Sequence, residues 1–124
     1  MPIVPVDFIN VASDISNIGN EAAFRSSISR AYYGSFNQCK EMADVKLSHT
    51  SHIKFADSSH ENLLRQMENE PLLSGWRSVA YMMRILKTER VESDYQMNAS
   101  VIESDALNAI SKANLIIGRL NQIP

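Results

Sequence analysis

The stretch that decides the fold reads Phe24-Arg25-Ser26-Ser27-Ile28-Ser29-Arg30-Ala31-Tyr32-Tyr33-Gly34-Ser35-Phe36. It lies in the middle of a helix that we predict from about Glu21 to Val45, with Asn20 as its N-terminal cap. One face of this helix carries apolar and small residues at a period of about 3.6 residues, and such a face is normally buried. Its members are Phe24, Ile28, Ala31, Tyr32, Ser35, Cys39 and Met42.

The opposite face of the same helix is polar, but it is not the usual solvated mixture of Glu and Lys. Short polar groups, one arginine and one aromatic residue follow one another at spacings of three and four residues. They are Ser26, Ser29, Arg30, Tyr33 and Asn37. Two interpretations stay open: a central helix of a bundle that is packed from two sides, or a polar face with a functional role.

The run from Arg25 to Phe36 resembles the signature helix of the HEPN family, the small helical domains of prokaryotic toxin–antitoxin and defence systems. The second part of that family's pattern is similar to Leu86-Lys87-Thr88-Glu89-Arg90-Val91-Glu92-Ser93-Asp94-Tyr95. The two matches are about sixty residues apart and occur in the family's order. The resemblance implies an up-and-down bundle of four to five helices that forms a homodimer.

Composition indicates one globular domain, residues 1–124. Apolar residues make up 44% of the chain and charged residues 21%, which are ordinary values for a folded protein. No apolar run approaches the length of about eighteen residues that a membrane span needs, and no signal-peptide pattern precedes the first helix, so we expect a cytoplasmic protein without membrane contact. The net charge of −2 argues against a protein that coats nucleic acid, although it allows a local cationic cleft.

Four further helices are predicted from periodicity and capping signals. Capping boxes begin at Ser58 and at Ser100, and Pro71 ends the helix before it. Residues 46–57 show little periodicity and are expected to form a loop. Because no alternating strand pattern occurs anywhere, the predicted fold class is all-α. The predicted helices cover residues 6–18, 58–70, 72–92 and 100–123.

Arg90 is the strongest single candidate for a functional site. It falls in the same stripe as the buried residues of the fourth predicted helix, whereas Arg77 and Arg84 fall on the outer side and are expected to be solvated. A charge in an inward register must be paired or must line a cleft. Asp94 is expected to neutralise it, within reach of Arg30. The alternative is that the helix ends before Arg90 and its side chain reaches water.

In catalytically active HEPN proteins, an Arg is followed after four to six residues by a His, and two chains form a cleft that cuts RNA without a metal. Arg90 matches this Arg, but Tyr95 takes the place of the His. A phenol with a pKa of about 10 is a poor base at neutral pH. His60 is the best substitute base, and the helix N-terminus is expected to keep it neutral. The candidate catalytic residues are Arg90, Tyr95, Asp94 and His60, and the candidate substrate-binding residues are Arg30, Arg25 and Tyr33.

Two functions therefore stay open for this chain. The first is a metal-independent endoribonuclease of a toxin–antitoxin or anti-phage defence system. The second is a noncatalytic HEPN-like domain that binds RNA, a nucleotide or a partner protein such as an antitoxin. His49 and His52 lie in a loop whose composition could suit a metal, but such loops are common, so neither a metal nor another cofactor is expected.

Overall fold

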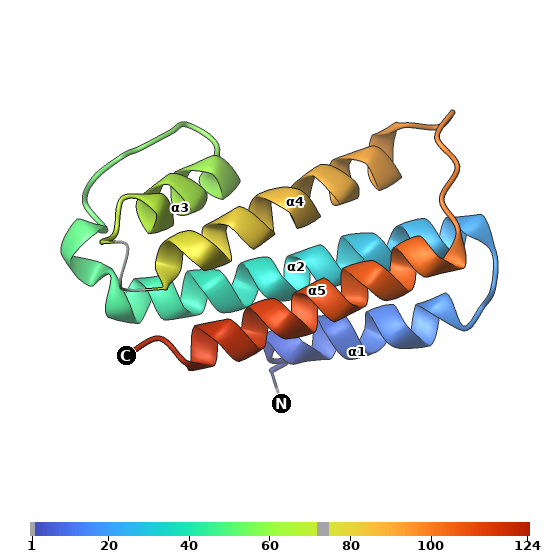
Figure 1. Cartoon of the computed structure of the whole chain (residues 1–124), viewed down its shortest axis with the longest axis horizontal. Coiled ribbons are helices and arrows are strands. Elements are labelled where there is room, and N and C mark those ends of the chain that lie inside the picture. Colours follow the sequence, from blue (N-terminus) through green and yellow to red (C-terminus); the bar gives the residue numbers. More distant parts are fainter. Residues whose placement is uncertain (1, 72–74) are drawn as a thin grey trace.

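Helices alone make up the secondary structure of the part of the chain that the computed structural model describes, residues 2–71 and 75–124. The helices α1, α2, α4 and α5 run along the long axis of the molecule, and the short α3 lies beside the N-terminal part of α4 (Figure 1). This arrangement confirms the predicted all-α helical bundle. The elements are α1 Pro5–Ser16, α2 Glu21–Lys46, the 3₁₀ turn η1 Ser48–Thr50, α3 Ser59–Glu68, α4 Trp76–Tyr95 and α5 Glu103–Asn121.

Asn20 and Ser58 cap α2 and α3 as predicted, but the predicted capping box at Ser58 is incomplete, because the Glu61 carboxylate accepts hydrogen bonds from other side chains instead. The side-chain oxygen of Asn20 accepts a hydrogen bond from the Ala23 N–H at 2.8 Å, and the Ser58 hydroxyl accepts one from the Glu61 N–H at 3.4 Å. The predicted start of α5 at Ser100 is wrong. The N-cap is Ile102, whose N–H donates to Asp105 Oδ2 at 2.9 Å.

Both ends of α4 differ from the prediction. The predicted start at Leu72 lies outside the described residues, and the helix begins at Trp76, directly after Gly75. Gly75 has a φ of 88°, a left-handed conformation that glycine adopts without strain. The helix continues to Tyr95 instead of ending near Glu92, so the alternative in which it ends before Arg90 is wrong.

Helix α1 packs closely on α2 because Gly34 has no side chain. A Cβ atom at this position would lie 2.8 Å from Cγ1 of Ile9 and 3.0 Å from the carbonyl oxygen of Pro5. The buried hydroxyl of Ser27 also donates to the carbonyl oxygen of Ala12 at 2.7 Å. A larger residue at position 34 would therefore push the two helices apart.

Helix α2 runs through the centre of the bundle and contacts each of the other helices. Its predicted apolar face is buried, with Tyr32 and Cys39 fully inaccessible to solvent, and only Met42 lies at the edge of the core. Burial raises the pKa of the Cys39 thiol to about 12, so this cysteine packs as a small apolar residue. Among the described residues, no helix combines the length and apolarity that crossing a membrane requires.

Candidate functional site

Arg90 points from α4 towards α2, in the inward register that its position predicts. Its side chain is 12% exposed, and its guanidinium carbon lies 5.3 Å from the ring centre of Tyr32 and 5.6 Å from that of Tyr33. Its Nη1 donates to Oδ2 of Asp94 at 3.3 Å. Its Nε is buried without a hydrogen-bond partner in the described residues. Arg90 is therefore held mainly by two aromatic rings and one carboxylate.

Asp94 neutralises Arg90, as its spacing of four residues on the same helix predicts. Its side chain is 28% exposed, and its Oδ2 also accepts a hydrogen bond from the Ser29 hydroxyl of α2 at 3.4 Å. Since Ser29 is 8% exposed, the polar face of α2 packs against α4 at this point. This supports the interpretation of α2 as a helix packed from two sides.

Arg30 lies over two rings instead of reaching Asp94. Its guanidinium carbon is 5.7 Å from the ring centre of Phe8 in α1 and 5.1 Å from that of Tyr33. Within the described part of the chain, its nitrogens donate no hydrogen bond. Tyr33 thus has arginines close to its ring from both α2 and α4, and its partly buried side chain packs against the core.

His60 joins this cluster from the first turn of α3. Its Nδ1 lies 2.6 Å from the Tyr32 hydroxyl oxygen, and its ring stacks on that of Phe36 at 4.1 Å between centres. Burial lowers the pKa of His60, and the positive charges of Arg90 and Lys87 lower it further. Burial and the neighbouring cations therefore favour the neutral imidazole.

The contact between Tyr32 and His60 also decides which ring nitrogen carries the proton. Tyr32 is fully buried, and this burial raises the pKa of its hydroxyl, so the phenol keeps its proton. A buried hydroxyl needs an acceptor, and His60 Nδ1 is its one partner in the described residues. Neutral His60 therefore carries its proton on Nε2, where it is a hydrogen-bond donor and not a base.

Tyr95 does not meet Arg90 within one chain. Its side chain is 68% exposed at the last position of α4, and it makes no hydrogen bond with any described residue. Residues five apart on a helix point in directions that differ by about 140°. The structure therefore brings Arg90 together with Asp94, His60, Arg30 and Tyr33, and leaves Tyr95 outside the cluster.

Arg25 has a structural task that sequence analysis did not identify. Its side chain is 13% exposed, and its nitrogens donate to the carbonyl oxygens of Ser93 at 2.9 Å, Gln96 at 3.0 Å and Ala99 at 2.6 Å. Its Nε also donates to Glu21 at 3.0 Å. Arg25 thus fastens the end of α4 and the loop after it to α2, and all three of its nitrogens are occupied.

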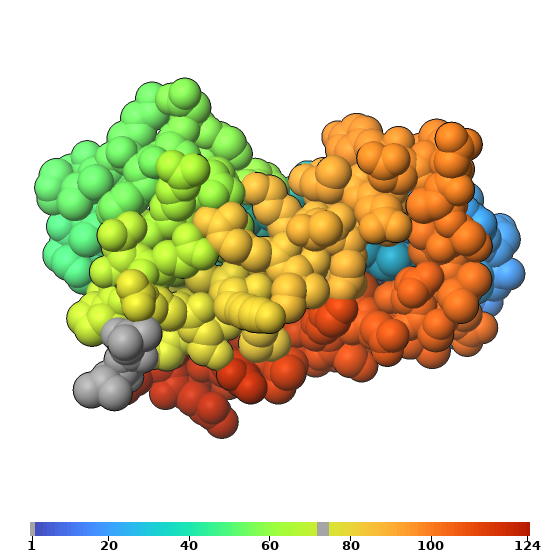
Figure 2. Space-filling model, turned by 45° about the horizontal axis from the view of Figure 1, so that its top comes forward, coloured from blue at the N-terminus to red at the C-terminus, as the bar shows by residue number. Residues whose placement is uncertain are grey.

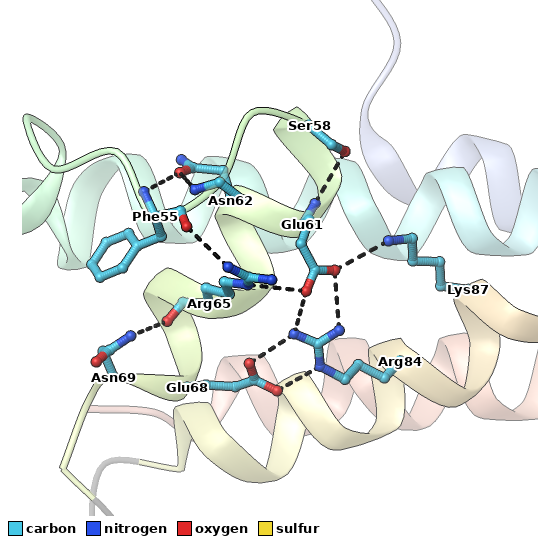
Figure 3. A network of polar contacts seen from close by, with 10 residues as sticks. Phe55, Ser58, Glu61, Asn62, Arg65, Glu68, Asn69, Arg84 and Lys87 are labelled. Atoms are coloured by element: carbon cyan, nitrogen blue, oxygen red, sulfur yellow. Dashed lines mark hydrogen bonds and ion pairs between the residues drawn. The ribbon is translucent and has the colours of Figure 1, made fainter.

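A charged network between α3 and α4 was also missed (Figure 3). Arg84 was expected to be solvated, but it forms ion pairs with Glu68 at 2.6 Å and with Glu61 at 2.8 Å. Hydrogen bonds from Arg84 and then Lys87 lower the pKa of Glu61 to about 2, although desolvation opposes them. The signal in the sequence was the spacing of seven between Glu61 and Glu68, which places both on one face of α3. This network holds His60 over α2.

The described residues contain no group of three or more His, Cys, Asp or Glu side chains placed to hold a metal ion. In the loop that could have suited a metal, His49 pairs with Glu70 at 3.3 Å instead. No family model, curated protein or solved structure matches the chain. The two sequence motifs and the geometry of the cluster around Arg90 are therefore the features of the chain that bear on its function.

Proposed function

We propose that the chain is a HEPN-like protein of a prokaryotic toxin–antitoxin or defence system, and that it binds RNA on the face formed by Arg30 and Arg90 without cutting it. The observation that carries this proposal is the state of Arg30. Its guanidinium is positioned by the rings of Phe8 and Tyr33, yet its nitrogens donate to no described residue.

An arginine in this state suits a phosphate group. The cation–π contacts with two rings restrict the Arg30 side chain, so less side-chain freedom is lost when two parallel hydrogen bonds form to phosphate oxygens. Arg90 adds a second positive charge, with its guanidinium carbon 5.6 Å from the centre of the same Tyr33 ring. Because Asp94 neutralises part of that charge, the face suits one or two phosphates of a chosen RNA and not a long nucleic-acid track.

The absence of a well-placed base supports binding over cleavage. Attack by a ribose 2′-OH requires a group that accepts its proton within hydrogen-bond reach. Tyr95 lies away from Arg90 on the outside of α4, and the Tyr32 hydroxyl occupies Nδ1 of His60. Neither residue can take that proton in the arrangement of the single chain.

A metal-independent endoribonuclease is the second candidate, and one observation favours it. His60 and Arg90 both lie against the Tyr32 ring, so a base-capable side chain and a cation occupy the same cluster. In either case we expect a homodimer, as the resemblance implies. Analytical ultracentrifugation at micromolar concentration checks this, and a monomer would count against any cleft shared by two chains.

The test is an RNA-binding titration with a fluorescein-labelled single-stranded RNA in excess EDTA, at salt concentrations between about 50 and 200 mM. We expect wild-type protein to bind and the RNA to stay intact. Arg30→Ala should weaken binding about tenfold and lower the salt slope by about one. Arg119→Ala, which removes the same charge from α5, serves as the matched control and should bind normally.

Two outcomes would contradict the proposal. Equal affinity for wild type and Arg30→Ala would exclude Arg30 as the phosphate contact. Cleavage in EDTA that leaves 2′,3′-cyclic phosphate ends and disappears in His60→Ala would replace the binding module by the nuclease.

A further inference from the structure

Two stretches of the chain contain no acidic residue, although its net charge is −2. They are residues 76–88 in α4 and residues 106–124 in α5 and the segment after it, and they hold five cations. Helices α4 and α5 run antiparallel (Figure 1), so the two stretches lie side by side. The hydrogen bond from Arg119 near the end of α5 to Ser78 near the start of α4 agrees with this antiparallel arrangement. Carboxylates outside the two stretches pair with three of these cations: Glu61 and Glu68 pair with Arg84, Glu61 pairs with Lys87, and Glu89 pairs with Lys112. The cations are Arg77, Arg84, Lys87, Lys112 and Arg119.

Between these two helices runs a hollow of about 530 Å³, which we name the α4–α5 groove. Three large side chains in its lining are unusually exposed for apolar residues: Tyr81 is 60% exposed, Leu115 50% and Ile85 40%. Figure 2 shows α4 and α5 next to each other on one face of the molecule. The lining of the α4–α5 groove contains no acidic residue; it consists of Ser78, Tyr81, Met82, Ile85, Lys112, Leu115 and Arg119.

The two cations of the α4–α5 groove differ in their partners. Lys112 forms an ion pair with Glu89, which neutralises it. Arg119 donates to the hydroxyl oxygen of Ser78 at 2.7 Å, and it forms no ion pair with a carboxylate of the described residues. An apolar groove therefore carries an uncompensated positive charge towards one end.

We infer that the α4–α5 groove binds an amphipathic helix of a partner protein, with apolar side chains against Ile85 and Leu115 and an acidic side chain against Arg119. Helices commonly bind in this way, by laying one apolar face into a groove between two others. Charge decides between the possible occupants. A second copy of this chain, placed groove to groove, would offer Arg119 no unpaired carboxylate, because the lining contains none and Glu89 is already paired with Lys112. RNA would leave the exposed leucine and isoleucine without an apolar contact.

The experiment uses the full chain and two fluorescein-labelled model peptides of about 18 residues, which are long enough to form a helix. Both carry the same leucine stripe; one has glutamates beside the stripe and the other has lysines. We expect the glutamate peptide to bind at least about tenfold more tightly than the lysine peptide. Arg119→Glu should abolish that preference, and Ile85→Ser should weaken both peptides. Circular dichroism controls for folding, and Lys40→Glu, on the exposed surface of α2, is the matched charge control.

Three results would overturn the inference. The first is equal affinity for the two peptides, and the second is binding that neither Arg119→Glu nor Ile85→Ser changes. The third is a different occupant: self-association that Ile85→Ser abolishes would assign the groove to a second copy, and RNA binding that Arg119→Glu abolishes would assign it to nucleic acid. This inference does not depend on the proposed RNA site, because the RNA proposal requires an effect of Arg30→Ala, whereas this one requires effects of Arg119→Glu and Ile85→Ser on peptide binding.

Discussion

Arg84 and Arg90 lie on the same helix, six residues apart, but they differ in exposure and in the number of their hydrogen-bond partners. Arg84 is 37% exposed and donates four hydrogen bonds to the carboxylates of Glu61 and Glu68. Arg90 is 12% exposed, donates to Asp94 at 3.3 Å and keeps a buried Nε without a partner. The more exposed arginine is therefore the better satisfied one.

This difference separates a structural arginine from one that belongs to a candidate site. A cation that only joins two helices gains most when most of its donors are used, and Arg84 uses its donors in four hydrogen bonds. A buried cation with an unused donor costs stability, and such costs tend to persist where function requires them. The cluster around Arg90 thus contains donors that no described residue accepts from, namely the Nε of Arg90 and the nitrogens of Arg30.

The largest effect is expected from Arg90→Ala. It removes the contacts with the Tyr32 and Tyr33 rings and leaves the carboxylate of Asp94 with Ser29 as its remaining partner. We expect the free energy of unfolding to fall by about 3 kcal/mol, measured by urea denaturation. Arg90→Met is the control, because it keeps much of the packing without the charge. A loss below about 0.5 kcal/mol in both variants would mean that Arg90 behaves like an exposed residue.

Arg84→Ala should cost less, about 1 to 2 kcal/mol, because its partners are partly exposed and water can replace some of the lost bonds. It should also change the response to acid. The folded-state pKa of Glu61 is about 2, below its ordinary value. The network therefore contributes fully at pH above that ordinary value, and its contribution is lost as the pH falls towards 2.

The measurement for Arg84 is the free energy of unfolding at about pH 7 and at about pH 3. The wild type should lose more stability between these values than Arg84→Ala does. An equal loss in both proteins would show that the α3–α4 network is not the source of the acid response. Lys40→Ala, which removes an exposed ion pair on α2, is the control and should keep the response of the wild type.

The bundle itself was predictable because its helices bury stripes with a regular period. The same periodicity correctly placed Arg90 inside, since Arg90 follows Leu86 at a spacing of four. The outward direction of Tyr95 could have been derived as well, because five residues along a helix correspond to about 140° of rotation. The HEPN-like motif specifies how many residues separate the Arg from the His. It does not specify in which direction each side chain points from the helix axis.

The partners of Arg25 and Arg84 could not be derived in this way. Arg25 binds backbone carbonyl groups more than sixty residues away, and every residue has a carbonyl, so no side-chain pattern identifies the right ones. The partners of Arg84 depend on how α3 lies against α4, and no periodicity within either helix specifies that arrangement. Periodicity predicts which face is buried but does not predict which element covers it.

Tyr32→Phe should have a smaller effect, about 1 kcal/mol, because it deletes one hydrogen bond while the ring remains in place. The same change tests the proton position on His60. In the wild type, ¹⁵N chemical shifts should show the proton on Nε2, and in Tyr32→Phe the tautomers should mix. A wild-type proton on Nδ1 would make His60 a possible base and would strengthen the nuclease candidate. Tyr81→Phe, on the exposed side of α4, is the matched control.

Changes at Tyr95 should have the smallest effect on stability, below about 0.5 kcal/mol, because the side chain is 68% exposed. Tyr95→Phe should leave RNA binding unchanged. Tyr95→His restores the pattern of Arg, four residues and His, yet it places the imidazole on the outside of α4 while Arg90 points inward. We therefore expect a single chain of this variant to leave RNA intact in EDTA. Cleavage whose rate rises with the square of protein concentration would contradict this expectation. It would mean that the introduced His of one chain meets Arg90 of another chain. The outer face of α4 would then belong to a site that two chains share.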